Sequence, residues 1–409
     1  MNWGSDAQIR ESLLHHKVPL KDTTPTGAYK VGKDVLQAVY DNRSKLKRKP
    51  DYLPMLLSII YLRRIKSRIS TFFDGYKELL QYDGKIHPRL LLHGARTGRL
   101  SSVSPNIQNV PRKGLIKTFY KSRWEGGFFG LIDLSQAELR MMAIMSNDQA
   151  FIANLMFDDA HTANAAMCLD KKPEDVTKTE RKASKAITFG LAYGGSPKNL
   201  AKRAGLDVKL VQKVADAMER SFPMLMGWME FKKQQAMDDL EATTVFGRTR
   251  RYNETKAIGG LGAVKRQAVN TPAQSTANDI NLIVLRGLAR RLKAVGAKSF
   301  PMFLVHDSTA IDIHPDELEM VARFVQEAFT DVWDTPIARL RAFKVLPIEG
   351  DLEISTTWAG CESTNEFYNP LYIYPCNSHV GRLDDYPDYS PPKVLQAREL
   401  PDPETLPLG

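Results

Sequence analysis

The spacing of apolar residues predicts that much of the chain is helical. An apolar residue at every third or fourth position places these side chains on one face of an α-helix. This spacing occurs in five stretches: residues 34–40, 53–80, 177–193, 197–220 and 261–295. The first two stretches predict a mainly helical N-terminal part, residues 1–90. The other three predict long helices in the middle of the chain.

Two shorter apolar regions predict strands. Residues 128–133 read Phe-Phe-Gly-Leu-Ile-Asp and end in a carboxylate. Residues 302–313 contain two apolar runs that meet at His306 and Asp307, which is the pattern of a β-hairpin. Strands that lie early and late in the chain, with helices between them, predict an α+β fold in which a sheet domain carries a helical insertion.

The C-terminal residues differ in composition from the rest of the chain. Residues 360–409 contain eight prolines and five tyrosines, and their apolar residues follow no helical period. They hold eight acidic against three basic side chains, whereas the whole chain has a net charge of +10. We therefore expect an extended acidic tail that contacts the body through its aromatic side chains. A surface brace and a docking strip for a partner protein are both open as its role.

Length and composition exclude several classes of protein. A chain of 409 residues exceeds the ~250–300 residues of a single hydrophobic core, which predicts two or three subdomains. No run approaches the ~18 apolar residues of a membrane helix, and the polar residues 1–10 are unlike a secretion signal. Cys168, Cys361 and Cys376 lack paired spacing, which disfavours a disulfide framework or a zinc site and fits a reducing cytoplasm.

The distribution of charge is typical of a nucleic-acid-binding protein. A basic body with an acidic end is the electrostatic pattern of such proteins, although many basic proteins bind no nucleic acid. Lys45, Lys47, Arg48 and Lys49 lie in a predicted turn, and four more basic residues follow between positions 63 and 68. These side chains either contact DNA phosphates, with an affinity that falls with salt, or form a solvated helix face.

Two aspartates occupy positions suited to binding metal ions. Asp133 ends one predicted strand, and Asp307 lies at the tip of the predicted hairpin. Carboxylates on adjacent strands can hold two divalent ions, one activating a 3′-hydroxyl and the other stabilising the leaving pyrophosphate. Hard oxygen ligands favour Mg²⁺, with Mn²⁺ as the usual substitute. Either aspartate by itself is more typical of a turn or a helix cap.

Residues 180–195 supply cations and aromatic rings at helical spacing. Arg181, Lys185, Phe189 and Tyr193 recur at every fourth position, which places two cations and two rings along one side of a helix. The cations suit a triphosphate, and the rings suit a stacked base. His161 is a candidate third phosphate contact. An aromatic stripe is also the ordinary pattern of a buried helix face.

Five sequence blocks resemble those of the family A DNA polymerases, the group of bacterial DNA polymerase I and its phage relatives. Asp133-Leu-Ser-Gln-Ala-Glu-Leu-Arg140 resembles their motif A, residues 181–194 resemble motif B, and Val305-His306-Asp307 resembles motif C. Residues 97–109 and 266–274 resemble two further blocks. The blocks follow the order of the family and extend over roughly residues 20–360.

The resemblance implies a right-hand polymerase fold with an antiparallel-sheet palm, helical fingers and a helical thumb. The implied domains are a thumb over residues 1–90, a palm over 91–150 and 275–360, fingers over 151–274, and a tail over 361–409. The implied activity is template-directed DNA synthesis in replication, in which dNTPs are added to a primer 3′-hydroxyl by two-metal phosphoryl transfer.

The resemblance also implies roles for individual residues. Asp133 and Asp307 bind the two Mg²⁺ ions, and Lys185 is also placed to give a proton to the pyrophosphate. Glu138 is the steric gate, which occupies the space of a ribose 2′-hydroxyl. The dNTP-binding set is Arg181, Lys185, His161, Phe189, Tyr193, Glu138 and Gln136. The set that contacts primer or template is Arg99, Asn106, Gln108, Asn109, Arg266, Asn270, Gln274 and His306.

Departures from the family pattern modify these expectations. Most of the family has glutamate after the motif C aspartate, where this chain has Ser308, which removes one acceptor near the metal ions and argues against high catalytic efficiency. Fewer than 100 residues precede the predicted palm, too few for the 3′–5′ exonuclease domain that usually lies there. We therefore expect no intrinsic proofreading, with the exonuclease either lost or separately encoded. Residues 1–40 resemble phage polymerases, which predicts a phage enzyme in the host cytoplasm.

Expected partners are primer–template DNA, dNTPs and a separate exonuclease or other replication protein, with no membrane. Single-subunit RNA polymerases and reverse transcriptases also carry two palm aspartates. Glu138 argues against the first class, and the motif around Lys185 argues against the second. The non-enzyme alternative is a catalytically impaired, polymerase-like DNA-binding subunit of replication. Ser308 alone favours it.

Overall fold

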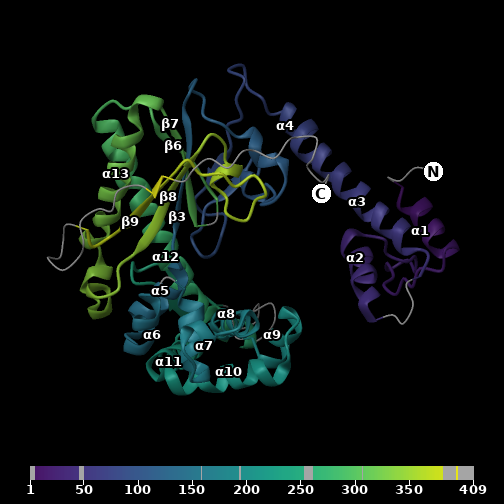
Figure 1. Ribbon diagram of the computed structural model, residues 1–409, viewed down its shortest axis with the longest axis horizontal. Coiled ribbons are helices and arrows are strands. Elements are labelled where there is room, and N and C mark those ends of the chain that lie inside the picture. Colours follow the sequence, from purple (N-terminus) through teal and green to yellow (C-terminus); the bar gives the residue numbers. More distant parts are fainter. Residues whose placement is uncertain are drawn as a thin grey trace. The chain divides into compact units, whose positions relative to one another are not determined.

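The computed structural model divides the chain into two units, Met1–His87 and Pro88–Gly409 (Figure 1). The structure describes residues 5–45, 50–157, 159–192, 195–252, 261–305, 307–380 and 393–394. Within this part of the chain, no helix is both long and apolar enough to cross a membrane.

The N-terminal unit consists of helices. They are α1 (Asp6–His15), α2 (Lys33–Asp41), α3 (Leu53–Ile69) and α4 (Gly75–Lys77), with a π-helical turn at Ser70–Asp74 between the last two. Buried apolar side chains of α1, α2 and α3, including Ile9, Leu36 and Leu56, form its core. The helices predicted over 34–40 and 53–80 are confirmed, although the π-helical turn interrupts the second.

The basic residues of this unit do not all face solvent. Arg63 forms an ion pair with Asp6 and donates a hydrogen bond of 2.6 Å to the Val31 carbonyl oxygen. It therefore ties α3 to the rest of the unit, in addition to any role at the surface. Residues 46–49, with the predicted turn lysines and Arg48, lie outside the described residues.

The C-terminal unit is built on a six-stranded sheet of order β10-β9-β8-β3-β7-β6, in which every pairing is antiparallel. The strands are β3 (Phe128–Leu134), β6 (Phe300–Val305), β7 (Ser308–Ile313), β8 (Glu349–Ser355), β9 (Tyr372–Asn377) and β10 (Lys393–Val394). A small pair, β1 (Arg89–Leu91) and β2 (Ser101–Val103), precedes them. The strand predicted over 128–133 and the hairpin predicted over 302–313 are both confirmed.

Helices and a short hairpin follow β3 in the chain. They are α5 (Ala137–Ser146), α6 (Gln149–Leu155), α7 (Ala160–Leu169), α8 (Lys178–Ala192), α9 (Pro197–Ala204), α10 (Val208–Ser221), α11 (Pro223–Asp238), β4 (Glu241–Thr243), β5 (Thr249–Arg251) and α12 (Leu261–Ala294). Helix α13 (Leu318–Thr330) comes between β7 and β8. One main sheet with a large helical insertion is the α+β fold predicted from the sequence.

The two faces of the sheet have different surroundings. Ile132, Ile311 and Leu352 belong to the large hydrophobic core, which α12 and α13 cover. Phe129 lies on the other face and stacks on Trp358, with ring centroids 6.1 Å apart. Side chains alternate along a strand, so Asp133 projects from the same face as Phe129. On this face Phe129 and Leu131 are buried, whereas Asp133, near the end of the strand, is exposed and is therefore available for a site.

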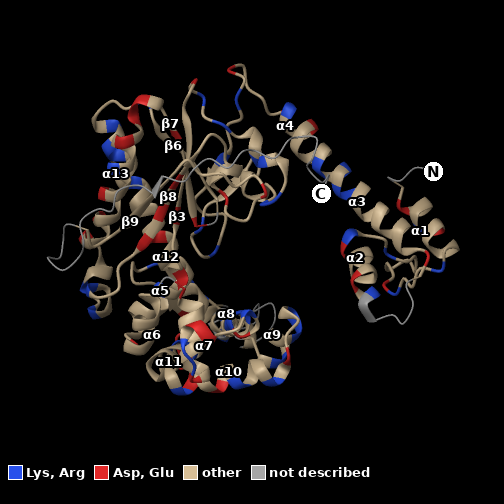
Figure 2. Ribbon diagram, in the orientation of Figure 1, with Lys and Arg blue, Asp and Glu red and all other residues tan. Residues whose placement is uncertain are grey.

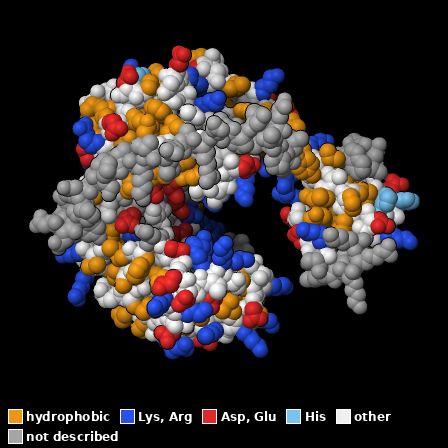
Figure 3. Space-filling model, viewed as in Figure 1, with side chains coloured by type: hydrophobic (Ala, Val, Ile, Leu, Met, Phe, Trp, Pro, Cys, Tyr) orange, Lys and Arg blue, Asp and Glu red, His pale blue; other side chains and the backbone are white. Residues whose placement is uncertain are grey.

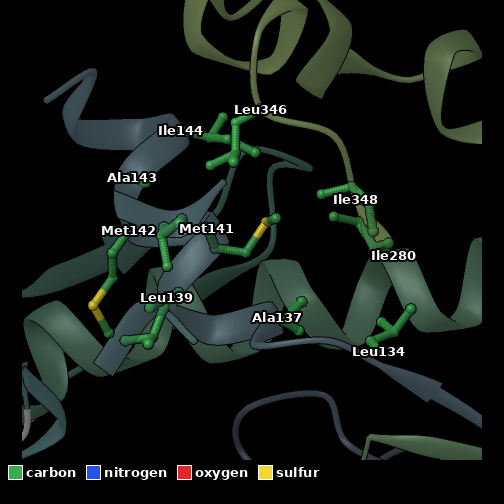
Figure 4. Packing of buried hydrophobic residues seen from close by; sticks show 14 of the residues in the cluster. Leu134, Ala137, Leu139, Met141, Met142, Ala143, Ile144, Ile280, Leu346 and Ile348 are labelled. Atoms are coloured by element: carbon green, nitrogen blue, oxygen red, sulfur yellow. The ribbon is translucent and has the colours of Figure 1, made fainter. Parts of the chain in front are cut away.

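Helix α5 follows β3 directly and is buried on nearly all sides. Leu139 and Met142 lie in one core with Ile280 of α12 and with Leu346 and Ile348, which precede β8 (Figure 4). A helix whose apolar residues surround it is held by packing on every face. The first turn of α5 therefore has a fixed position relative to β3 and α12.

Two sequence predictions about this unit are wrong in detail. The helix predicted over 197–220 is two helices, because Gly205 (φ +64°) ends α9 and the Asp207 side chain caps α10 by accepting from the Leu210 N–H. The tail predicted from residue 361 onward contains β9, an internal strand of the main sheet. Tyr374 and Cys376 of β9 are buried in the core.

Asp148 joins two helices of the insertion, and we expect Asp148→Ala to destabilise the protein strongly. Its buried carboxylate accepts from the N–H of Phe151 at the start of α6 and from those of Met224 and Leu225 at the start of α11, each at 3.0 Å. Alanine leaves these donors unsatisfied, which lowers the free energy of unfolding by about 2–4 kcal/mol. Denaturant titration measures the loss.

The matched control for this prediction is Asp207→Ala. Asp207 makes one capping bond, of 3.0 Å, to a single N–H at an exposed helix start. Its removal costs about 1 kcal/mol. Equal losses for the two variants would show that the Asp148 carboxylate does not join α6 to α11 energetically.

Candidate active site

Strand β3 brings Asp133 to the turn of the β6–β7 hairpin. Asp133 pairs in register with Ser308, which lies 175 residues later and directly follows Asp307. Opposed residues of antiparallel strands project from the same face. The structure thus brings together Asp133 and Asp307, the two aspartates singled out in the sequence. Figure 2 shows acidic residues in red along these strands.

The hydroxyl group of Ser308 acts directly on Asp133. Its Oγ donates a hydrogen bond of 2.7 Å to Asp133 Oδ1. The protein surrounding this carboxyl raises its pKa above the usual range, Ser308 opposes the shift, and the neighbouring charge of Asp307 adds to it. In this position a serine orients one carboxylate oxygen of Asp133, whereas the glutamate common in the family would add a negative charge.

Arg99 neutralises part of the acidic surface. Its Nη2 lies 2.6 Å from Asp307 Oδ1 and 3.0 Å from Glu138 Oε1. Gln274 of α12 donates a second hydrogen bond, of 3.1 Å, to the same Glu138 oxygen. One arginine therefore links a predicted metal ligand to the predicted steric gate, and the gate side chain is held from two sides.

The backbone beside Arg99 is itself fixed by neighbours. Gly98 has φ +79°, and a Cβ there would lie 2.5 Å from the Arg248 guanidinium carbon. Asn278 of α12 donates a 3.0 Å hydrogen bond to the Gly98 carbonyl oxygen, and Arg248 pairs with Asp279 at 2.7 Å. Only glycine allows both the backbone conformation and this close approach.

Strand β8 adds acidic side chains to the same face. Asp351 pairs in register with Asp133 on the side opposite Ser308, and Glu353 follows two residues later. Gly350 permits the close pairing, because a Cβ there would lie 2.5 Å from the Asp133 carbonyl oxygen. Burial raises the pKa of Glu353 to about 8, and the charges of Asp351 and Asp133 contribute to the rise.

Because of this raised pKa, we expect Glu353→Gln to stabilise the metal-free protein at pH 8 but not at pH 4. The unfolded chain releases this proton near the ordinary value of 4.5, while the folded protein keeps it up to about 8. Glu353 therefore contributes to the free energy of unfolding in full below pH 4.5, and this contribution is lost as the pH rises through 8. A neutral glutamine avoids the loss, for a gain of about 1–3 kcal/mol at pH 8.

Thermal unfolding in EDTA at the two pH values measures this difference. Glu366→Gln, at an exposed position later in the chain, is the control and should behave like the wild type at both pH values. A stabilisation by Glu353→Gln that is the same at pH 4 and pH 8 would contradict a proton held by the folded state.

Helices α7 and α8 gather the predicted phosphate ligands. Arg181 and Lys185 lie one turn apart on α8, and His161 lies in the first turn of α7, which packs on α8. Burial lowers the pKa of His161 to about 4, with the charges of Lys185 and Arg181 adding to the effect. The imidazole is therefore neutral at pH 7. Figure 3 shows a group of basic side chains on the helical part of this unit.

The structure does not test every residue of this set. Phe189 lies on α8, but its side chain is not described, and Tyr193 and His306 lie outside the described residues. Gln136 is at the entry to α5 with left-handed backbone angles (φ 51°), which is unusual for a residue other than glycine. Among the described residues, nothing hydrogen-bonds its buried Oε1, so this acceptor is unused.

The predicted primer and template contacts fall into two groups. Arg266, Asn270 and Gln274 follow one side of α12, and Gln274 reaches Glu138 as described above. Asn106 and Gln108 have local roles: Asn106 Oδ1 accepts from the Gln108 N–H, and Gln108 Nε2 donates to the Leu100 carbonyl oxygen at 2.8 Å. Asn109 is exposed and available to a ligand.

The donor set around Asp133 fits Mg²⁺. Within the described part of the chain, no group of three or more carboxylate, histidine or cysteine side chains is arranged to hold a metal ion. Mg²⁺ commonly binds to one or two protein carboxylates and takes its other ligands from substrate phosphates and water. Asp133 and Asp307 supply such a pair of oxygen ligands.

The sequence did not point to several residues that build this site. Arg248, Asn278 and Asp279 position the Gly98–Arg99 backbone, and Asp351 lies beside Asp133. An acid at every second position, as at 351 and 353, signals one face of a strand. The contacts of Arg248 and Asn278 leave no such signal, because they depend on the packing of α12 against distant segments.

Comparisons with known proteins agree with this geometry. The family model described as DNA polymerase family A matches residues 1–360. DNA polymerase I of Chloroflexus aurantiacus is 30% identical over 313 residues, which cover 75% of this chain and 32% of that protein. DNA polymerase I of Streptococcus pneumoniae serotype 4 is 31% identical over 294 residues, covering 70% and 34%. The chain thus spans about a third of the length of these curated relatives.

A similar solved structure is the POL domain of Pol1 from M. smegmatis, in complex with DNA primer-template and dNTP. It superposes with a TM-score of 0.71 at 26% sequence identity. The superposition covers 88% of this chain and 62% of that one.

Proposed function

This chain belongs to DNA polymerase family A, and from that premise we propose that it carries out template-directed DNA synthesis. It adds dNTPs to the 3′-hydroxyl of a primer paired with template DNA. The observation that carries the proposal is the β3–β7 register, which places Asp133 and Asp307 at one end of the sheet, with Arg99 linking Asp307 to Glu138. The M. smegmatis structure, which contains primer-template and dNTP, supports the same substrates here.

We assign the parts of the hand as the sequence predicts. Residues 1–90 form the thumb, 91–150 and 275–360 the palm, and 151–274 the fingers. Strand β9 extends the palm sheet beyond residue 360. A phage origin and a location in the host cytoplasm stay predictions from the sequence.

In this proposal each side chain has a defined task. Asp133 and Asp307 hold two Mg²⁺ ions, whose chemistry when bound is to activate the primer hydroxyl and to stabilise the leaving pyrophosphate. Arg181 and Lys185 bind the triphosphate as cations, and His161 contributes a neutral N–H donor. Lys185 also gives a proton to the pyrophosphate.

The remaining residues select and align the substrates. Glu138, held by Arg99 and Gln274, occupies the space that a ribose 2′-hydroxyl needs. Gln136, Phe189 and Tyr193 shape the pocket for the nascent base pair. Primer and template contact Asn106, Gln108, Asn109, Arg266, Asn270 and His306, together with Arg99 and Gln274.

Primer extension tests this proposal. A labelled primer on a template of known sequence is incubated with Mg²⁺ and one dNTP at a time, and only the complementary nucleotide should be added. Changing the template base should change the nucleotide that is added, and EDTA should stop the reaction. Incubation without dNTPs measures any shortening of the primer from its 3′ end.

A negative result would also be informative. Binding of primer–template without any extension would favour the catalytically impaired DNA-binding subunit. Extension without regard to the template would contradict the assignment of template-directed synthesis.

A further inference from the structure

One carboxylate connects two of the proposed triphosphate ligands. Asp159 immediately precedes α7, where its Oδ1 accepts hydrogen bonds from the backbone N–H groups of His161 and Thr162, at 3.2 and 3.3 Å. Its Oδ2 accepts from the Thr162 hydroxyl at 2.7 Å. The same carboxylate receives Arg181 of α8, with Nε 2.6 Å from Oδ2 and Nη2 3.2 Å from Oδ1.

The geometry of this pair restricts the guanidinium group. Two parallel hydrogen bonds to one carboxylate fix both the position and the plane of an arginine head group. They use the Nε–Nη2 edge, which leaves the amino group Nη1 to meet a ligand. Arg181 lies 22 residues after Asp159 and on a different helix, so the contact also sets how α7 and α8 align.

The carboxylate of Asp159 stays negatively charged. Its surroundings alone would raise its pKa, but the hydrogen bonds from Arg181 and Thr162 hold the pKa well below the usual range. The carboxylate is therefore ionised at any physiological pH. Arg181 and Asp159 are each about two-fifths exposed, so a ligand can reach the pair from solvent.

We propose that Asp159 is a positioning residue for dNTP binding, which holds Arg181 and the His161 end of α7 in the arrangement that receives the triphosphate. This inference rests on the proposed function. An arginine that is already oriented loses less conformational freedom when phosphate binds, which increases affinity. The negative charge of Asp159 by itself would repel a triphosphate. Removing Asp159 should therefore weaken dNTP binding if its main effect is to position Arg181, and strengthen dNTP binding if its main effect is repulsion.

The decisive variant is Asp159→Asn, measured by equilibrium binding of the complementary dNTP. The enzyme is bound to primer–template with Mg²⁺, and the primer ends in a dideoxynucleotide, so that chemistry does not contribute. Asparagine is as good a helix N-cap as aspartate, so α7 should stay intact. Loss of the arginine contact should raise the Kd for dNTP by about 3–10-fold, while primer–template affinity and melting temperature change little.

Glu180→Gln is the matched control. Glu180 also lies in the first turn of α8, accepts from the Thr177 N–H and pairs with Lys171, but does not contact Arg181. The Kd of the Glu180→Gln variant for dNTP should equal that of the wild type. A double variant, Asp159→Asn with Arg181→Ala, should bind dNTP no more weakly than Arg181→Ala alone, because Asp159 acts through Arg181.

The outcomes separate the two proposals. If Asp159→Asn leaves the Kd for dNTP unchanged, Asp159 serves only as a helix cap. If the Kd for dNTP falls, Asp159 competes with the triphosphate for Arg181. Either result overturns the inference while DNA synthesis by the wild type stands. A wild-type enzyme that neither binds nor incorporates dNTP would overturn the proposed function and this inference together.

Discussion

Replacing Asp307 with alanine should abolish primer extension, with a fall in kcat of at least about 10³-fold. Asp307 is one of two carboxylates at the end of β3 and in the β6–β7 turn, and the hard-ion site has only this pair of proposed protein ligands. Removing one leaves Asp133 to hold both ions. Steady-state extension in Mg²⁺, compared with the wild type at saturating dNTP, measures the loss.

Binding of primer–template should survive this change. The variant surface is less negative, and Arg99 is freed from its 2.6 Å contact with Asp307, so the Kd for DNA should stay equal or fall. Asp316→Ala, an 84% exposed aspartate a few residues after β7, is the control and should extend primers normally. Substantial extension by Asp307→Ala would remove Asp307 from the proposed metal site.

Glu138→Ala should allow ribonucleotides into the product, with discrimination in kcat/KM falling by about 10²-fold. The side chain of Glu138 is held by Arg99 at 3.0 Å and by Gln274 at 3.1 Å, so it cannot swing away to admit a 2′-hydroxyl. Alanine removes the obstruction. The measurement compares kcat/KM for ATP and dATP opposite the same template thymine.

Glu138→Gln separates size from charge in this prediction. Glutamine keeps the volume of the side chain and can still meet Gln274, but it loses the ionic contact with Arg99. Discrimination should therefore stay close to the wild-type value. If alanine and glutamine relaxed it equally, Glu138 would act through its charge and not by filling space.

The elements that the sequence predicted well are those with a strong local pattern. Strand β3 and the β6–β7 hairpin are short apolar runs that end at Asp133 and at Asp307. This pattern fixed their type, and the antiparallel pairing followed from the short turn. Arg181 and Lys185 were found because one helix carries both.

Other features were missed because the local signal was overlooked or hidden. Gly205 and Asp207 mark the end of α9 and the start of α10 with ordinary capping chemistry, yet the apolar period across them suggested one helix. Strand β9 includes Pro375 and lies within a proline-rich region. The composition of that region predicted an extended tail, and this prediction was applied to the six residues of β9 as well. The strand forms because β8 supplies its partner.

The electrostatic contacts of the site lay beyond sequence reasoning altogether. Arg99 meets Asp307 across 208 positions, and Gln274 meets Glu138 across 136. Nothing in the spacing of these residues predicts which acidic side chain an arginine will contact. Family resemblance pointed to the residues that we propose to touch substrates, whereas the folded structure was needed to show what holds those residues in place.

The position of β3 in the sheet has a consequence for the order in which the protein forms during synthesis. Its neighbours β7 and β8 leave the ribosome after the entire helical insertion, and Ser308 follows Asp133 by 175 residues. At ~5–20 residues per second, β3 waits roughly 10–35 s for its first partner. Both of its backbone edges are unpaired in that interval, as in an exposed edge strand prone to aggregation. A nascent chain that stops before β7 is therefore expected to hold an aggregation-prone strand in place of the proposed metal site.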